Sequence, residues 1–207
     1  MKNVLITGGH GDIAQAIACE LQQAGGYNVL TPGRQELDVT DPKSIQALLE
    51  HFTPDILVNN AGYVHPCSIK QADIHDIQRH VSVNLTAVFL CTALALRKNP
   101  QLQIINIGSS AATKIHATWS EYCATKAAVV MATKCWAEDG LYAVCVSPGR
   151  TKTKMRKGLF PQEDQATLLL PEDFAKVVMR AVRQAYPSGA HINVNKENVQ
   201  ELINETI

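Results

Sequence analysis

The sequence has no excess of charge of either sign. Its 207 residues hold 19 Lys and Arg against 19 Asp and Glu, so the formal net charge is zero. A protein that binds nucleic acid or a membrane surface mainly by electrostatic attraction needs a basic excess. We therefore expect neither nucleic acid nor a membrane among the partners of this protein.

The sequence also lacks the marks of export, membrane insertion and metal binding. Its first apolar run is short and belongs to a strand, whereas a signal peptide or a membrane span needs a longer one. None of the six cysteines forms a C-x-x-C pair, and several fall inside apolar patterns. His75 and His80 lie five residues apart, which is off one helix face. These absences favour a reduced, cytoplasmic protein without a metal site.

Strand and helix patterns alternate along the chain, and no linker, repeat or low-complexity segment interrupts them. We therefore predict one domain over residues 1–207, an α/β doubly wound, Rossmann-type parallel sheet of about seven strands with helices on both faces. The strand patterns are 3–7, 27–31, 35–39, 55–59, 103–107, 142–147 and 190–194. The helical patterns are 13–24, 42–51, 73–97, 120–137, 171–185 and 197–205.

One connection in this pattern is irregular. Only the three residues "PGR" separate strand pattern 27–31 from strand pattern 35–39, and a helical crossover takes at least about 10–12 residues. Two alternatives remain open from the sequence. Segment 35–39 is either a bent continuation of the preceding strand, or the sheet has lost one crossover helix and pairs there by an unusual route.

Two helical patterns are apolar nearly all round. They are 73–97 and 120–137, and a helix that covers one face of a sheet needs only one apolar stripe. A domain of this size leaves little room to bury a second stripe of each helix. We therefore expect a homodimer or homotetramer formed through these helices.

The first candidate site is the turn "TGGHGDIA", which joins an apolar strand to a helix. Backbone N–H groups at a helix N-terminus attract an anion, and glycines permit its close approach. The working spacing is Gly8-x-x-Gly11-x-x-Ala14, in which Ala14 is small enough for close packing of helix on strand. We expect the Asp12 carboxylate to point away from the phosphates and to cap its helix.

Four more polar motifs follow strands or lie on the next helix. They are "LVNNAG" at 57–62, "INIGSS" with Ser109, "YCATK" with Tyr122 and Lys126, and "SPGRTKT" at 147–153. Ligands of open α/β sheets bind beyond the carboxyl ends of the strands. Tyr122 and Lys126 lie one helical turn apart, and an ammonium beside a phenol is expected to lower the pKa of the tyrosine.

Together these motifs resemble the short-chain dehydrogenase/reductase family from Lys2 to about Thr153. The resemblance implies that Tyr122 is the general acid in reduction and the base in oxidation. It implies that Lys126 lowers the Tyr122 pKa and binds ribose hydroxyls, and that Ser109 holds the reacting carbonyl. Asn84, in "VNLTAVFL", corresponds to the family asparagine that positions a water behind Lys126. Asp12 and Ala14 depart from the family, since glycines often occupy their positions.

The resemblance also implies a set of cofactor-binding residues. The end of the second strand reads "LTPGRQ" and carries no carboxylate for a ribose 2′-hydroxyl, but it carries Arg34, which can pair with a 2′-phosphate. The sequence therefore favours NADP over NAD. The implied cofactor residues are Gly8, Gly11, Asp12, Ile13, Arg34, Asp38, Val39, Asn60, Ala61, Gly62, Tyr122, Lys126, Pro148, Gly149, Thr151 and Thr153.

A basic stretch follows the Pro-Gly motif within an expected substrate lid at about 150–170. A solvated, mobile lid accounts for such a stretch, and so does a lid that holds a phosphorylated or otherwise anionic sugar or polyol. Its basic residues are Arg150, Lys152, Lys154, Arg156 and Lys157.

The function expected from all these features is an NAD(P)H-dependent oxidoreductase acting on a small carbonyl or alcohol. A sugar-nucleotide epimerase or dehydratase is one alternative, but such chains usually add a C-terminal substrate domain. A non-catalytic, NADP-sensing regulator is the other, but such proteins typically lose the tyrosine or the lysine.

Overall fold

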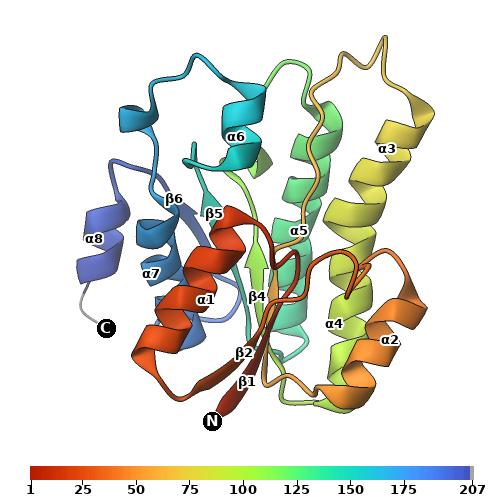
Figure 1. The fold of residues 1–207 in the computed structure, drawn as a ribbon, viewed down its shortest axis with the longest axis vertical. Helices are drawn as coiled ribbons and strands as arrows, with labels where there is room; N and C mark the ends of the chain where they lie inside the picture. Colours follow the sequence, from red (N-terminus) through yellow and green to blue (C-terminus); the bar gives the residue numbers. More distant parts are fainter. Residues whose placement is uncertain (206–207) are drawn as a thin grey trace.

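The protein, described here over residues 1–205 of a computed structural model, is built on one six-stranded sheet in the order β2-β1-β3-β4-β5-β6 (Figure 1). All five pairs of neighbouring strands are parallel. The strands are β1 (Lys2–Ile6), β2 (Tyr27–Leu30), β3 (Ile56–Asn59), β4 (Gln103–Ile107), β5 (Ala143–Pro148) and β6 (His191–Val194). Every residue of β3, β4 and β5 is buried, as expected for apolar parallel strands covered on both faces.

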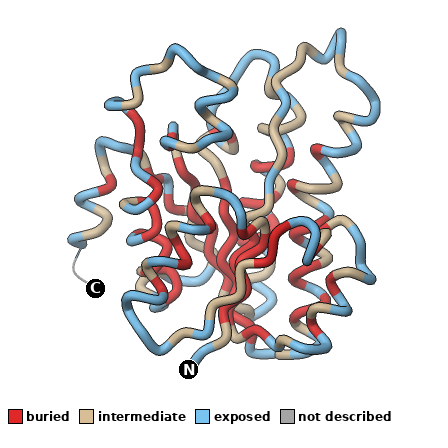
Figure 2. Tube along the Cα trace, in the orientation of Figure 1, coloured by how far each residue is buried: buried red, intermediate tan, exposed pale blue. Residues whose placement is uncertain are grey.

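Helices cover both faces of the sheet, which confirms the doubly wound fold. Helices α1 and α7 pack on one face, and α2, α4 and α5 lie on the other, with the buried core on the strands between them (Figures 1 and 2). The helices are α1 (Asp12–Ala24), α2 (Pro42–His51), α3 (Ile74–Val81), α4 (Ala87–Lys98), α5 (Ser120–Glu138), α6 (Lys154–Leu159), α7 (Pro171–Val182) and α8 (Val199–Asn204). Residues 206 and 207 of the expected domain lie outside the described range.

The predicted strand at 35–39 is wrong, which leaves six strands instead of about seven. The N–H groups of Glu36 and Leu37 both donate to the carbonyl of Gly33, so the chain turns after β2. It then reaches β3 through α2, and β2 is an edge of the sheet. Leu37 and Val39 are buried in the core beside α2. The alternation of these two residues with polar residues therefore reflects the burial of their side chains in a loop, and not the pairing of a strand.

The predicted helix 73–97 is continuous but changes its winding. Helices α3 and α4 are joined by a π-helical turn, Ser82–Thr86, that contains Asn84. By length and composition alone, Ile74–Lys98 is long and apolar enough to cross a membrane, and 44% of its apolar window is buried inside the protein. The core helices of globular proteins have the same properties, and α4 packs on the sheet.

Candidate active site

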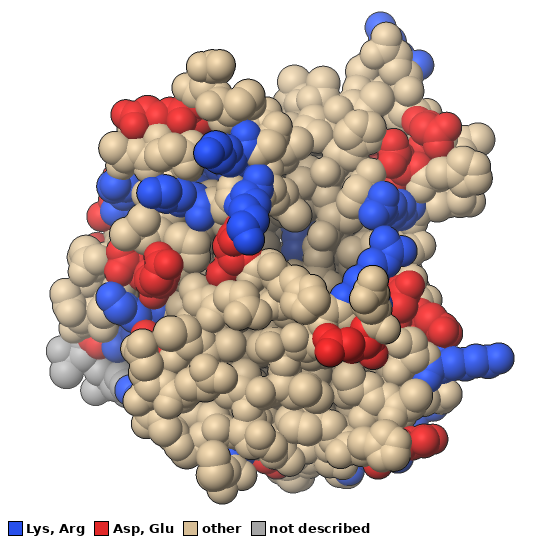
Figure 3. All heavy atoms as spheres, viewed as in Figure 1, with Lys and Arg blue, Asp and Glu red and all other residues tan. Residues whose placement is uncertain are grey.

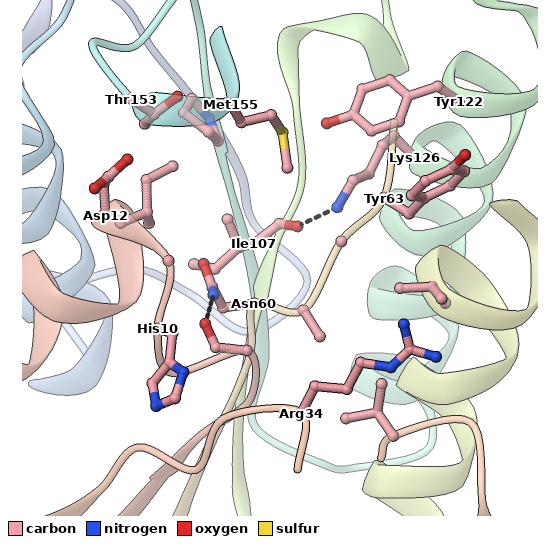
Figure 4. Close-up of a pocket in the computed structure, with 18 of the residues that line it drawn as sticks. His10, Asp12, Arg34, Asn60, Tyr63, Ile107, Tyr122, Lys126, Thr153 and Met155 are labelled. Carbon is pink, nitrogen blue, oxygen red and sulfur yellow. Dashed lines mark hydrogen bonds between the residues drawn. The ribbon is translucent and has the colours of Figure 1, made fainter. Parts of the chain in front are cut away.

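A cavity of about 420 Å³ lies beyond the carboxyl ends of the central strands. Its wall combines the glycine turn, the Arg34 loop, the end of β3, helix α5 and helix α6 (Figure 4). Figure 3 shows the same hollow on the surface, with basic side chains on both of its rims. All the predicted cofactor residues line it except Gly149 and Thr151. Motifs far apart in the sequence therefore meet, because parallel strands end at one edge of the sheet.

The glycine turn brings backbone close to backbone. Gly8 has φ +67°, and a Cβ atom on it would lie 2.9 Å from the Cα of Ala61. A Cβ on Gly9 would meet the carbonyl oxygen of Thr31 at 2.1 Å. Helix α1 begins at Asp12, so the unpaired N–H groups of its first turn lie at the cavity wall. Ala14 is fully buried in the core, as the close packing of helix on strand requires.

Asp12 is bonded to the lid and not to its own helix. One carboxylate oxygen accepts a hydrogen bond of 2.6 Å from the backbone N–H of Lys154, and the other lies 3.8 Å from the Lys154 Nζ atom. Helix α1 has Gly11 at its N-cap and no side-chain cap. The expectation that Asp12 caps its helix is therefore wrong. In Figure 4 its carboxylate points toward Thr153, the N-cap of α6.

The loop after β3 is tied to the glycine turn by Thr7 and Asn60. The Thr7 hydroxyl accepts hydrogen bonds from the N–H groups of Asn60 and Ala61, both at 3.0 Å. The Asn60 amide donates to the carbonyl of Thr7 at 2.9 Å. The "NNAG" motif therefore holds two adjacent walls of the cavity in a fixed relation.

Asn84 lies behind the cavity wall and not in it. Its side chain is fully buried, accepts from the Tyr63 N–H at 2.7 Å and donates to the Tyr63 carbonyl at 2.8 Å. Its amide also lies 3.4 Å from the hydroxyl of Thr125, the residue before Lys126. Asn84 thereby fixes the backbone of Tyr63, whose side chain lines the cavity.

Tyr122 and Lys126 face the cavity from one side of α5. The Lys126 Nζ atom donates to the Ile107 carbonyl at 2.9 Å and lies 5.8 Å from the centre of the Tyr122 ring (Figure 4). Burial lowers the pKa of Lys126 to about 8. Burial raises the pKa of Tyr122, and the Ser109 hydroxyl beside it opposes that rise.

The expected lowering of the Tyr122 pKa by Lys126 stays a prediction, because burial is the main influence on this pKa while Ile107 holds the ammonium group. The ammonium group is held by the Ile107 carbonyl and stands over the ring. Ser109 itself follows β4 and caps a short 3-10 helix, where its hydroxyl accepts from the Ala111 N–H at 3.1 Å. Of the four predicted catalytic residues, Tyr122 and Lys126 line the cavity, whereas Ser109 and Asn84 adjoin it.

Gly149 and Thr151 form the base of the lid. The Gly149 N–H donates to the Val194 carbonyl at 2.7 Å, and Thr151 is buried and forms a β-bridge with Leu169. The lid they support contains α6, which the sequence patterns did not indicate. A Thr153 cap is the local signal for this helix, since its hydroxyl accepts from the Arg156 N–H.

Most of the basic side chains of the lid are paired within the protein. Arg156 makes two hydrogen bonds to the Glu163 carboxylate, at 2.6 and 2.7 Å, and Arg150 makes a third at 3.2 Å. Arg156 and Arg150 hold the pKa of Glu163 below its usual range. Together with the pair of Lys154 and Asp12, three of the five lid cations have an acidic partner.

The cavity also has lining residues that were not among the predicted cofactor and catalytic residues. Tyr63 follows "NNAG" directly, and Arg79 lies one helical turn before Val83 on the same face, so proximity to a motif was the available signal. Of these lining residues, His10, Val83, Ile107 and Gly108 lie inside the quoted motifs and Lys154 lies in the basic stretch. The others are Leu37, Thr40, Tyr63, Arg79 and Met155. Across residues 1–205 no group of three or more His, Cys, Asp or Glu side chains could hold a metal ion.

Comparison with known proteins points to one family. The family model described as short chain dehydrogenase matches residues 34–164. The chain is 31% identical to the 3-oxoacyl-[acyl-carrier-protein] reductase FabG of Vibrio cholerae, over 94% of this chain and 96% of that protein.

Two further comparisons agree with this family. The chain is 29% identical to the benzil reductase ((S)-benzoin forming) of Bacillus subtilis, over 75% of this chain and 77% of that protein. A solved short-chain dehydrogenase/reductase of Serratia marcescens, a double mutant, superposes with a TM-score of 0.80 at 25% identity, over 93% of this chain and 96% of that one.

Proposed function

The chain belongs to the short-chain dehydrogenase/reductase family and is an NAD(P)-dependent oxidoreductase, and we propose that it interconverts a carbonyl and an alcohol in the cavity at the ends of its strands. One observation carries this proposal. Tyr122 and Lys126 line the same cavity as the glycine turn and the N-terminus of α1. The proposed proton donor therefore lies in the same cavity as the backbone N–H groups that suit the phosphates of a dinucleotide.

Tyr122 is suited to donate a proton at neutral pH. Its pKa is raised by burial, so the phenol is protonated when a carbonyl arrives. When bound, the nicotinamide supplies or accepts the hydride at the carbonyl carbon. Tyr122 gives its proton to the carbonyl oxygen, and Ser109 donates a hydrogen bond to that same oxygen. In the reverse direction the phenolate takes the proton of the alcohol.

Lys126 stabilises the phenolate that the transfer leaves behind. Its ammonium group lies over the Tyr122 ring in a buried setting, where the attraction between opposite charges is stronger than in water. We propose that it exchanges the Ile107 carbonyl for the ribose hydroxyls of the cofactor. The water relay expected behind Lys126 stays a prediction, supported by the buried position of Asn84 next to Thr125.

The predicted cofactor residues divide between two ends of the cavity. Gly8, Gly11 and the first turn of α1 suit a pyrophosphate, and the remaining lining residues suit the adenosine and nicotinamide ends. We propose NADP as the cofactor. The side chain of Arg34 is 74% exposed and 3.9 Å from Asp38, so its guanidinium is available to a 2′-phosphate. Asp38 is held by the Thr40 backbone and hydroxyl, at 2.9 and 2.6 Å.

The substrate is a small carbonyl or alcohol compound. The basic residues of the lid suggested an anionic sugar or polyol as the substrate. Support for such a substrate is weak, because Arg150, Lys154 and Arg156 already pair with acidic side chains of the protein. Both relatives described above are named as reductases, one of 3-oxoacyl-[acyl-carrier-protein] and one of benzil. Both names describe the reduction of a ketone.

We further propose a homodimer or homotetramer formed through helices α3–α4 and α5. Val81, Phe89 and Met131 on these helices are 41%, 44% and 60% exposed. Phe89 packs edge-on against Trp136 at 5.3 Å, which joins the two helices in one apolar surface. A cytoplasmic location agrees with six free cysteines, and stays a proposal.

The proposed function is tested by following NADPH absorbance with a panel of ketones, diketones, sugars and ketose phosphates. We expect turnover of at least one carbonyl by the purified protein and none above background by a Tyr122→Phe variant. Turnover that survives Tyr122→Phe would contradict the assigned mechanism.

A further inference from the structure

Two aromatic rings connect the lid to the reacting tyrosine. The ring of Phe160, at the end of α6, stacks on the indole of Trp119 with centroids 6.1 Å apart and an interplanar angle of 20°. Trp119 in turn meets the Tyr122 ring edge-on at 5.5 Å and 84°. Such offset and edge-to-face pairs are the favoured geometries of aromatic side chains. The lid therefore touches the catalytic helix through an apolar surface.

This apolar surface continues toward the Tyr122 hydroxyl. In Figure 4 the phenol oxygen points across the cavity toward Met155, which comes from α6. Met155 and Phe160 are 52% and 36% exposed, so both keep surface that a bound molecule can cover. Met155 lines the cavity that Tyr122 faces, whereas Trp119 and Phe160 adjoin it through the contact of the indole with the Tyr122 ring.

Three of the five basic side chains of the lid have acidic partners beside this surface. The Arg156 guanidinium lies 4.6 Å from the centre of the Phe160 ring while both its hydrogen bonds go to Glu163. The backbone N–H of Lys154 is held at Asp12, on the side of the glycine turn, and the Lys154 Nζ atom lies 3.8 Å from the same carboxylate. An uncharged, flat group beside Tyr122 would leave these pairs intact.

The position of Trp119 is fixed before any substrate binds. The residue before it, Thr118, has φ +66°, a conformation that costs energy for a side chain other than glycine. The carbonyl of Thr118 accepts a hydrogen bond of 2.8 Å from the N–H of Cys67, in the loop that follows β3. The neighbouring loop therefore holds the turn that presents the indole.

We propose that Trp119, Phe160 and Met155 form an aromatic subsite, and that the substrate is an aryl ketone or aryl diketone and not a phosphorylated sugar. The inference rests on the proposed carbonyl reduction. In that reaction the C=O π bond breaks, and a hydride from a C–H bond of NADPH would form the new C–H bond. The Tyr122 O–H bond breaks as its proton forms the new O–H bond, which leaves a phenolate beside Lys126. NADPH is oxidised to NADP⁺ and the ketone is reduced to the alcohol.

The first test compares two diketones that differ in one group. In 1-phenylpropane-1,2-dione a phenyl replaces one methyl of butane-2,3-dione, so the reacting carbonyls are alike. We expect Trp119→Ala to lower kcat/KM for the phenyl compound about tenfold, mainly through KM, and to leave the value for butane-2,3-dione within about twofold. Trp119→Phe should restore most of the loss, and Phe160→Ala, a change on the exposed lid, should reproduce it.

The matched control is Trp136→Phe, since Trp136 is the other tryptophan of the chain and packs against Phe89, away from the cavity. It should change neither kcat/KM value. An equal loss for both diketones in Trp119→Ala and Phe160→Ala would overturn the aromatic subsite. So would a higher kcat/KM for dihydroxyacetone phosphate than for the phenyl compound.

A binding measurement separates this inference from the reaction itself. In Tyr122→Phe protein with NADPH, ligand-observed NMR should detect saturation transfer to the phenyl protons of 1-phenylpropane-1,2-dione. The transfer should fall in the Tyr122→Phe/Phe160→Ala protein. If no carbonyl is turned over but this difference is found, the proposed reaction fails and the subsite stands. If carbonyls are reduced but the difference is absent, the subsite fails and the reaction stands.

Discussion

The carboxylate of Asp12 and the backbone N–H of Lys154, 142 residues apart in the sequence, form a hydrogen bond of 2.6 Å. Asp12 begins α1 at the glycine turn, and Lys154 begins α6 in the lid. A side chain that stands where the family often has glycine therefore connects the phosphate end of the cavity to the segment that covers it. At its other end the lid rests on Trp119 through Phe160.

The first prediction concerns this connection. Asp12→Ala should release the first turn of α6, because the charge-assisted hydrogen bond contributes about 1 kcal/mol at a partly exposed site. Amide hydrogen exchange in α6 should become roughly fivefold faster. Asp12→Asn is the matched control, since its amide oxygen can still accept from Lys154. Equal exchange rates in the two variants would contradict the assigned role of the carboxylate.

The second prediction concerns the proton donor. Tyr122→Phe should lower kcat by about 10²–10⁴-fold, the usual contribution of a positioned general acid, and leave the affinity for NADPH within about twofold. Steady-state kinetics and calorimetric titration with NADPH measure the two effects. Tyr27→Phe, on β2, is the control and should change neither quantity. A kcat of Tyr122→Phe within about twofold of the wild type would contradict the assigned proton donation.

The third prediction concerns cofactor choice. Arg34→Ala should weaken NADPH binding about 10–100-fold, the contribution of a charge-assisted hydrogen bond, and leave NADH binding almost unchanged. Arg97→Ala, an exposed arginine at the end of α4, is the control for the lost positive charge. Equal weakening of both cofactors by Arg34→Ala, or no weakening, would remove the basis for NADP.

The fourth prediction concerns the buried ammonium of Lys126. Its pKa is lowered from 10.5 to about 8 by burial, so between these values the unfolded chain binds more protons than the folded protein. The free energy of unfolding therefore gains about 3 kcal/mol from this group as the pH rises through that window. Below pH 8 both states are protonated, and the penalty of burying the charge is present in full.

Urea unfolding at pH 7 and pH 10 measures this effect as a difference between variants. The stability of the wild type relative to Lys126→Met should rise between the two pH values, whereas relative to Lys134→Met, an exposed lysine on α5, it should stay constant. The subtraction removes the opposite contribution of the buried Cys91 thiol, whose pKa burial raises. A constant difference for Lys126→Met would show that the ammonium is not buried in solution.

The fifth prediction concerns assembly. Phe89→Glu combined with Met131→Glu should convert the proposed dimer or tetramer to single chains, because each places a charge on the apolar surface shared by α4 and α5. Light scattering after size exclusion measures the mass. Ile115→Glu, at a fully exposed position in the loop before α5, is the control and should leave the mass unchanged. A single-chain mass for the unmodified protein would contradict the proposed assembly.

Local pattern predicted most of the fold, and the family resemblance of the motifs predicted much of the site. The residues of β3, β4 and β5 are mostly apolar, as suits strands that are covered on both faces. The burial of these strands could therefore be predicted from the sequence. Parallel strands then bring their carboxyl ends to one edge, so the predicted motifs had to meet there. This geometry is why residues as far apart as Gly8, Asn60 and Tyr122 could be assigned to one cavity from the sequence.

The sequence by itself determined which residues are buried and which stand at the ligand edge. The tertiary structure decided what each polar group pairs with. Alternation at Leu37 and Val39 records burial alone, and without a neighbouring strand to bond, the segment is a loop. Likewise the Asp12 carboxylate, the Lys126 ammonium and the Arg156 guanidinium found partners on distant elements. Hydrogen bonds and ion pairs depend on contact in space, which local periodicity does not encode.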